Sequence, residues 1–190
     1  MKHGFLRAAR AGAIGVVAVA LAAGAAPAGD DAPPFTARAG ETLARDAAAA
    51  WSEDARLVYV ENDEPLADAG LAGRWGYLFH SPSLDAVRAY SVRDGKIRTA
   101  MNPRFDFEAP PLPGDWIDSG EALAAAEKKG REFREKHAGT VRAMFLVRGI
   151  LDPEHPDAPT WAVVYDSDSA PGLWVVVDAR SGKVVKTWRG

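Results

Sequence analysis

Apolar and polar positions follow two successive patterns along the chain, each with a helical period first and strand-like runs afterwards. In the first pass, the segment 41–51 places Leu43, Ala47, Ala50 and Trp51 on one face, which predicts a helix. The Asp94-Gly95 pair is a hairpin signal between two later runs. Short apolar runs predict strands at 56–61, 75–80, 87–92 and 96–100, with a loop at 62–72.

The second pass repeats this order. Asp118 and Glu121 have the spacing of a capping box, which predicts a helix over 118–137. Glycine in a helix costs about 1 kcal/mol relative to alanine, so we expect Gly130 to pack closely on a sheet. Gly139 is expected to end the helix. One stripe of the helix holds Leu123, Ala126, Gly130 and Phe133, and strands are predicted at 141–147, 161–165, 173–177 and 183–188.

The two passes agree in spacing as well as in order. Both second strands open on Trp followed by a small residue, and the turn glycine follows 20 positions after Trp75 and 21 after Trp161. A duplicated unit of about 70 residues explains this agreement. Two ordinary α+β stretches that share hairpin chemistry are the alternative. We predict an α+β fold of two tandem repeats, 41–100 and 118–190, each one helix followed by a three- to four-stranded antiparallel sheet, joined by a Pro-rich linker at 101–117.

The predicted strands are apolar on both faces. One helix covers one face of an antiparallel sheet, and the other face normally alternates toward polar residues. The runs WGYLF, WAVVY and LWVVV show no such alternation. The second face of each sheet must therefore meet the other repeat, another chain or a ligand, and we expect contact between the repeats.

The first 28 residues have the pattern of a signal peptide: a basic start, an Ala-rich apolar run and small residues before a polar break. An uncleaved anchor is the alternative, although the run is short and weakly apolar. A disordered lead-in is expected at 29–40. We expect a bacterial product that is periplasmic or secreted. No second long apolar run occurs, so the mature chain is not expected to span a membrane.

Charge and cysteine content exclude several classes of function. The net charge is −3, and loss of Lys2, Arg7 and Arg10 with the leader would bring it to −6. An acidic chain without a basic block is a poor candidate for nucleic-acid binding. The sequence has no Cys, which excludes a lipid-anchored cysteine, disulfides and thiolate metal sites.

Candidate chemistry is sparse. His155 lies in an acidic, Pro-rich loop, and Asp166 to Ser169 resembles the start of a calcium loop, but neither has a complete ligand spacing and a hairpin turn explains the second better. Nucleotide-binding, protease and hydrolase signatures are absent, and no pair of acids stands out on a predicted apolar strand. We predict no catalytic, metal or cofactor residues. Trp75 and Trp161 are expected in the core, and the binding candidates are Trp174 and Trp188.

The second repeat resembles the PepSY domain. That family commonly ends with an apolar strand, Asp, a Gly turn and Val or Ile, which match Val175 to Asp178, Gly182 and Val184 here, while Trp161 opens the preceding strand. The first repeat departs from the pattern, since Ser91 stands where the second has Asp178. The resemblance implies a small, mostly secreted or membrane-associated α+β module proposed to inhibit or regulate peptidases, without known catalytic residues.

We therefore expect an exported, non-catalytic binding module that regulates or inhibits an envelope or secreted peptidase, or binds another envelope protein. Two alternatives stay open. A small-molecule or lipid carrier would have a cavity lined by Trp161, Leu173 and Phe133. An enzyme of unrecognised type would have buried acids that converge in a cleft.

Overall fold

The apolar runs of both halves of the sequence join in one antiparallel sheet that carries two helices. The computed structural model describes residues 33–103 and 110–190, so the predicted leader lies outside the described residues. In chain order the elements are α1 (Ala37–Trp51), β1 (Arg56–Asn62), β2 (Leu66–Ala67), the short 3-10 helix η1 (Asp68–Gly70), β3 (Leu71–Ala72), β4 (Trp75–Ser81), β5 (Ala86–Arg93), β6 (Lys96–Met101), α2 (Ser119–His137), β7 (Thr140–Arg148), β8 (Pro159–Asp166), β9 (Leu173–Asp178) and β10 (Val184–Arg189).

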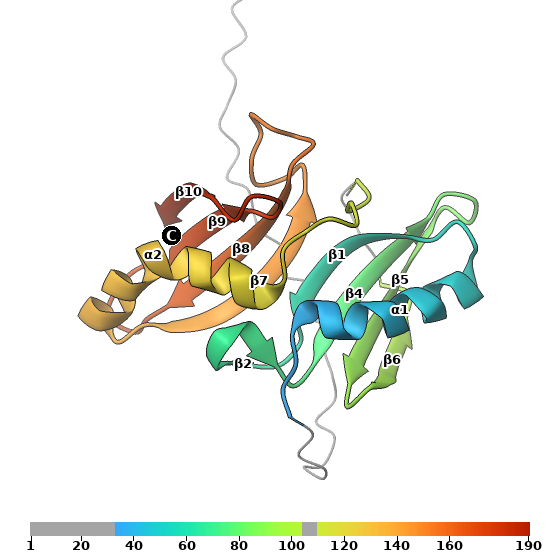
Figure 1. Ribbon diagram of the computed structural model, residues 1–190, viewed down its shortest axis with the longest axis horizontal. Helices are drawn as coiled ribbons and strands as arrows, with labels where there is room; N and C mark the ends of the chain where they lie inside the picture. The colour runs from blue at the N-terminus through green and yellow to red at the C-terminus, as the bar shows by residue number, and fades with distance from the viewer. Residues whose placement is uncertain (1–32, 104–109) are drawn as a thin grey trace, which may run out of the picture.

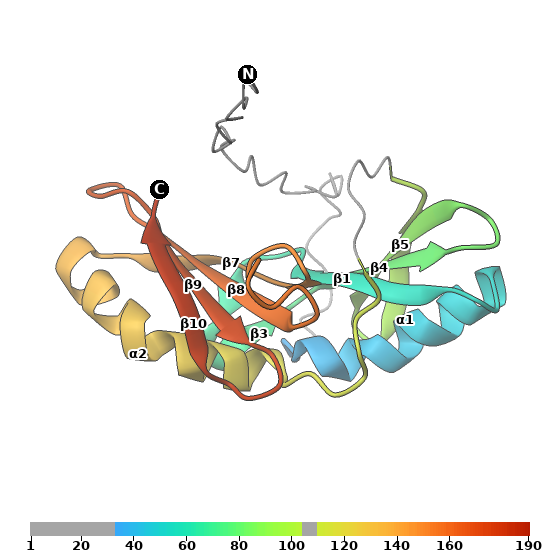
Figure 2. The same cartoon turned by 90° about the horizontal axis from the view of Figure 1, so that it is seen from above.

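The eight long strands lie in the order β10-β9-β8-β7-β1-β4-β5-β6, and every neighbouring pair is antiparallel. Both helices lie on one side of this sheet (Figures 1 and 2). The α+β class is thereby confirmed, but the prediction of a separate sheet for each half is wrong. The halves meet edge to edge, where β1 pairs with β7 around Val60 and Leu146. This pairing satisfies backbone groups that two separate sheets would leave free at their edges.

The helices differ from prediction in their ends and in one face. Helix α1 begins at Ala37, inside the segment expected as a lead-in, and it buries Ala37, Gly40, Glu41, Ala44 and Ala48. The predicted face lies at the border of the buried one, because the Ala-rich segment offers several stripes of similar hydrophobicity. Ala50 is exposed, and the other predicted residues, Leu43, Ala47 and Trp51, are partly buried against the core. Helix α2 ends at His137, and its C-cap residue Ala138, rather than Gly139, adopts the left-handed conformation. The stripe predicted for α2 is buried as expected.

The predicted capping box of α2 is present, and it serves both helices. The Asp118 carboxylate accepts hydrogen bonds from the amides of Ser119 at 2.7 Å and of Arg38 at 3.0 Å. The Ser119 hydroxyl accepts from the Ala37 amide at 3.1 Å. Thr36, the N-cap residue of α1, makes no capping bond with its own side chain. The first turn of α1 is therefore capped by side chains from the start of α2.

Replacing Asp118 with alanine is expected to lower the free energy of unfolding by about 2 kcal/mol, because amides of two helices lose their acceptor at once. Urea denaturation followed by tryptophan fluorescence measures this. The control is Thr36→Ala, which removes no capping bond and is expected to cost less than about 0.5 kcal/mol. Equal effects of the two substitutions would contradict the shared cap.

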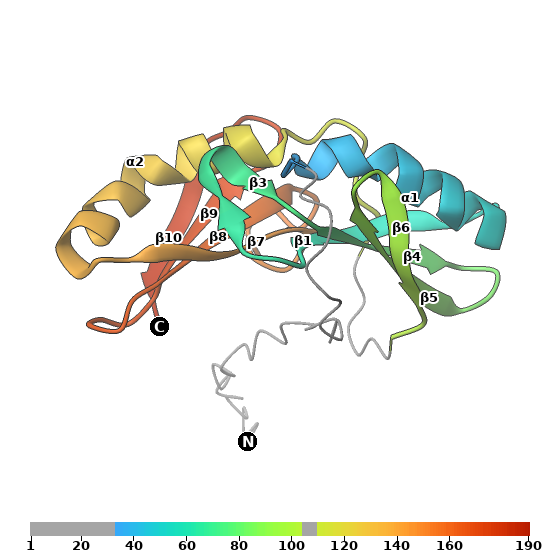
Figure 3. The same ribbon diagram turned by 90° about the horizontal axis from the view of Figure 1, so that it is seen from below.

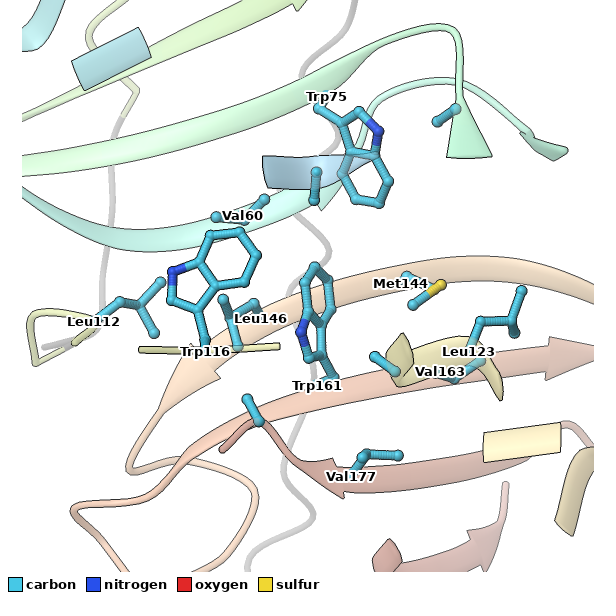
Figure 4. Close-up of a cluster of buried hydrophobic side chains, with 14 of the residues drawn as sticks. Val60, Trp75, Leu112, Trp116, Leu123, Met144, Leu146, Trp161, Val163 and Val177 are labelled. Atoms are coloured by element: carbon cyan, nitrogen blue, oxygen red, sulfur yellow. The ribbon is translucent and has the colours of Figure 1, made fainter. Parts of the chain in front are cut away.

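Three indole rings form the centre of the core between the helices and the sheet (Figure 4). Trp161 contacts Trp75 at 6.2 Å and Trp116 at 5.8 Å between ring centroids, in edge-on geometry. The indole N–H of Trp75 donates to the Phe35 carbonyl at 2.8 Å, and that of Trp161 donates to the Ile117 carbonyl at 2.9 Å. Each acceptor lies two residues before a helix begins. Trp116 belongs to the segment predicted as a linker, whose end thus enters the core.

A second apolar cluster lies on the opposite side of the sheet, which we call the outer face. Its residues alternate along β4, β8 and β9 with those that face the helices. The β7–β8 loop contributes Leu151 to this cluster. The expected burial of one repeat's sheet against the other's is therefore wrong, because the halves lie side by side in one sheet. The buried members on the sheet are Val58, Tyr59, Leu78, Ala89, Phe145, Val147, Ala162, Val164 and Val176.

The loop predicted at 62–72 contains a small hairpin, β2–β3, which crosses over to the other half of the molecule. Its tip, η1, packs on the start of α2 (Figure 3). Gly70 has a φ of 72°, and a Cβ there would lie 2.5 Å from the Ser119 carbonyl oxygen. Only glycine fits both the backbone angle and the close approach. Within the described residues, no helix is long and apolar enough to cross a membrane.

Candidate functional site

The two predicted binding residues lie next to each other on the outer face. Trp174 on β9 and Trp188 on β10 are direct partners in the strand register. Their rings stack at 5.2 Å between centroids with an interplanar angle of 16°, and both side chains are half-buried. The Lys186 ammonium lies 5.4 Å from the Trp188 ring centroid, within the range of a cation–π contact.

Two further rings extend this pair across the sheet, and sequence reasoning did not identify them. Phe145 on β7 meets Trp174 edge-on at 6.1 Å, and Tyr59 on β1 stacks on Phe145 at 5.8 Å. We call Tyr59, Phe145, Trp174 and Trp188 the aromatic strip. It runs from the edge strand β10 to the middle of the sheet, on the face opposite the two helices.

The aromatic strip ends at two carboxylates, Glu61 and Asp63, which we call the acid pair. The Tyr59 hydroxyl donates to Glu61 Oε2 at 3.0 Å, and the Ser91 hydroxyl donates to Asp63 Oδ2 at 2.7 Å. Gly76 makes room for Asp63, since a Cβ at that position would lie 2.6 Å from Asp63 Oδ1. The packing of the sheet therefore places both carboxylates beside the last ring of the strip.

Burial shifts the titration of the acid pair. Desolvation, together with the negative charge of Asp63, raises the pKa of Glu61 from 4.5 to about 8, against the opposing effect of the Tyr59 hydrogen bond. Desolvation also raises the pKa of Asp63, although Ser91 and Arg74 act in the other direction. Glu61 is mainly protonated at pH 7, and in that state its carboxyl group can donate as well as accept a hydrogen bond.

The sequence did not identify the acid pair, because Asp63 lies just after β1, in the segment predicted as a loop, and because a β-bulge changes the face of Glu61. The register of β1 against β4 shifts between Leu57 and Tyr59. Simple alternation places Tyr59 and Glu61 on the same face as Leu57, toward the helices. The bulge moves both to the outer face, beside Phe145. The sequence carries no strong signal for a bulge at this place.

The remaining candidates from the sequence take structural positions. His155 pairs with Asp152 at 3.0 Å in the β7–β8 loop, and no group of metal-ligating side chains occurs in the described part of the chain. Asp166 begins the turn between β8 and β9, as expected of a hairpin. Trp161 and Phe133, proposed as the lining of a carrier's cavity, are core residues in contact with Trp116 and Tyr165, respectively.

No protein-family model matches this chain, and no curated protein does either. Among solved structures, the chain is similar to the crystal structure of a "putative lipoprotein" from Clostridium difficile 630. The TM-score is 0.53 at 15% sequence identity, and the match covers 80% of this chain and 93% of that one. At this identity the similarity concerns the fold alone.

Proposed function

We propose that this chain is an exported, non-catalytic binding module that recognises a protein partner through the aromatic strip. The observation that carries the proposal is the half-buried pair Trp174 and Trp188 on the outer face, which the buried rings of Phe145 and Tyr59 hold in place from the inner end of the strip. Aromatic side chains dominate the energetics of protein interfaces, because they bury large areas at a small entropic cost. The acid pair beside Tyr59 adds hydrogen-bonding groups at the inner end of the strip.

We also propose that the chain arose by duplication of one PepSY-like unit. The matching indole bonds of Trp75 and Trp161 support this, as does the symmetric strand order around β1 and β7. In both halves, the last strand is bulged, and the register shift begins two residues after the turn glycine, Gly95 or Gly182. Repeated bulges at equal positions are unusual in unrelated hairpins, because bulges are specific local features.

The resemblance to PepSY domains suggests the kind of partner. We propose an envelope or secreted peptidase that this protein regulates or inhibits. The leader-like segment 1–28 supports export, and the absence of Cys from the sequence argues against anchoring through a lipidated cysteine. A periplasmic or secreted location follows from this proposal.

Replacing Trp174 with alanine is expected to weaken partner binding at least tenfold, which corresponds to about 1.4 kcal/mol. The experiment captures proteins from a bacterial envelope extract on the immobilised mature chain, then measures affinity and peptidase activity with the captured partner. Thr187→Ala is the matched control. Thr187 lies beside Trp188 on β10 but pairs with Val175, whose side chain faces the helices. Capture that is equally strong with both variants would contradict the aromatic strip as the binding surface.

A catalytic role is the second candidate function, and the acid pair is the observation that favours it. Glu61, whose pKa burial raises to about 8, can act as a general acid near neutral pH, and burial also raises the pKa of Asp63 beside it. Turnover of peptide or glycoside substrates that is lost in Glu61→Gln would favour an enzyme. Turnover that is equal in the two proteins would remove the acid pair from consideration as a catalytic group.

A further inference from the structure

A long groove follows helix α2 on the side that faces the β2–β3 hairpin, away from the outer face. One hollow of about 380 Å³ lies between α2, the hairpin and the start of β7. A second hollow, of about 510 Å³, lies farther along the same helix, toward Gly139. The two hollows share Glu127 and Arg134, so they adjoin. The helix residues that line them recur at helical spacing: Gly120, Leu123, Ala124, Glu127, Arg131 and Arg134.

The middle of this α2 groove is apolar, an acid lies at one end, and two arginines lie together with two glutamates at the other end. Leu66 from the hairpin, Ala124 from α2 and Val141 from β7 line the middle. Asp68 lies at the end where the hairpin tip meets the start of α2, and its side chain is exposed. Arg134, with 44% of its side chain exposed, lies near the other end.

Two acids, Glu127 and Glu135, lie at the arginine end of the groove. Glu127 accepts a hydrogen bond from the Tyr165 hydroxyl at 2.9 Å and pairs with Arg134 at 3.4 Å, so the charges of Glu127 and Arg134 offset each other. Glu135 and the exposed Arg131 line the same hollow. The exposed guanidinium group of Arg131, with Arg134 one turn farther along the helix, can bind a carboxylate there, and Asp68 can bind an ammonium group at the opposite end.

The separation of these charges sets the length of a matching ligand. A helix rises about 1.5 Å per residue, so the part of α2 from Gly120 to Arg134 is about 21 Å long. An extended peptide advances about 3.3–3.6 Å per residue, so about six residues fit this length. We propose that the α2 groove binds a short apolar peptide with free termini, its amino group at Asp68 and its carboxylate at Arg131 and Arg134. This site is separate from the aromatic strip.

The test titrates the full chain with the hexapeptide Ala-Leu-Ala-Val-Ala-Leu by isothermal titration calorimetry. We expect binding to the free peptide and at least tenfold weaker binding to the same peptide with an amidated C-terminus. Ala124→Phe is expected to weaken binding at least tenfold, because the new ring fills the groove from an exposed position and leaves the core intact. The control is Glu132→Phe on the opposite flank of α2, where the side chain is 75% exposed; it is expected to bind like the parent.

Two further measurements distinguish the α2 groove from the aromatic strip and from a site for a different ligand. Trp174→Ala is expected to keep the peptide affinity, because Trp174 lies on the other face of the sheet. Equal affinity for the acid and amide peptides, or undiminished binding by Ala124→Phe, would overturn the proposal. Binding of decanoate without binding of the peptide would also overturn it, and would assign the groove to an amphiphilic carboxylate instead.

Discussion

Replacing Trp161 with alanine is expected to lower the free energy of unfolding by about 4 kcal/mol, a larger loss than for any other substitution proposed for this chain. The side chain is fully buried, and its ring contacts Trp75 from one half of the chain and Trp116 from the linker. Its indole N–H also fixes the Ile117 carbonyl at the entry to α2. The substitution therefore removes a large apolar volume, two aromatic contacts and a hydrogen bond at the junction of the two halves.

Urea denaturation followed by far-UV circular dichroism measures this loss. Trp161→Phe serves as a milder variant in case the alanine variant does not fold, and it is expected to lose about 2 kcal/mol, since most of the apolar contact remains. Trp188→Ala is the control. That ring is half-buried on an edge strand, and its removal is expected to cost about 1 kcal/mol. A Trp161→Ala protein as stable as the Trp188→Ala protein would contradict the central role of Trp161.

Much of the fold could be predicted from local patterns. Strand β4, which begins at Trp75, and strand β8, which begins at Pro159 two residues before the predicted start at Trp161, were identified because apolar runs with flanking turn residues are strong local signals. The capping box at Asp118 was identified for the same reason. The hairpin at Asp94-Gly95 has positive φ at both positions, as its sequence predicts.

The relation between the halves could not be predicted in this way. Strands β1 and β7 carry no signal that each is the other's neighbour, since pairing across more than 80 residues depends on backbone groups that every sequence has. Apolar residues on both faces of the strands indicated a second buried surface correctly. The pattern does not say what covers that surface, and the assumption that the repeats stack face to face was wrong.

The candidate site was predicted in part, for a physical reason that differs between its two ends. Trp174 and Trp188 lie on the last two strands, which a short turn joins, so the sequence identified both as candidates, but only the register of β9 against β10 places them side by side. Tyr59 and Glu61 follow a bulge, which reverses the face of every residue after it. Arg134 and Asp68 line the same groove only because the β2–β3 hairpin crosses onto α2, and no local sequence pattern indicates this crossing.

Replacing Glu61 with glutamine is expected to stabilise the protein at pH 8 by about 2 kcal/mol and to leave its stability at pH 4.5 nearly unchanged. Burial raises the pKa of Glu61 from 4.5 to about 8 in the folded protein. Between these two pH values the folded state holds a proton that the unfolded state releases, so the parent loses stability as the pH rises. The full shift corresponds to at most about 5 kcal/mol, and we expect less because the side chain is only partly buried.

The measurement is the free energy of unfolding in urea at pH 4.5, 6 and 8 for the parent and three variants. Glu61→Gln keeps an acceptor for the Tyr59 hydroxyl, so its profile is expected to be flatter than that of the parent. Tyr59→Phe removes the hydrogen bond that favours the ionised carboxylate, which raises the pKa of Glu61 further and extends the loss of stability to higher pH. Glu132→Gln changes an exposed acid on α2 and is expected to run parallel to the parent. Parallel profiles for Glu61→Gln and the parent would mean that Glu61 titrates like an exposed acid. That result would contradict the raised pKa of Glu61 and, with it, the role of the acid pair as a proton donor near neutral pH.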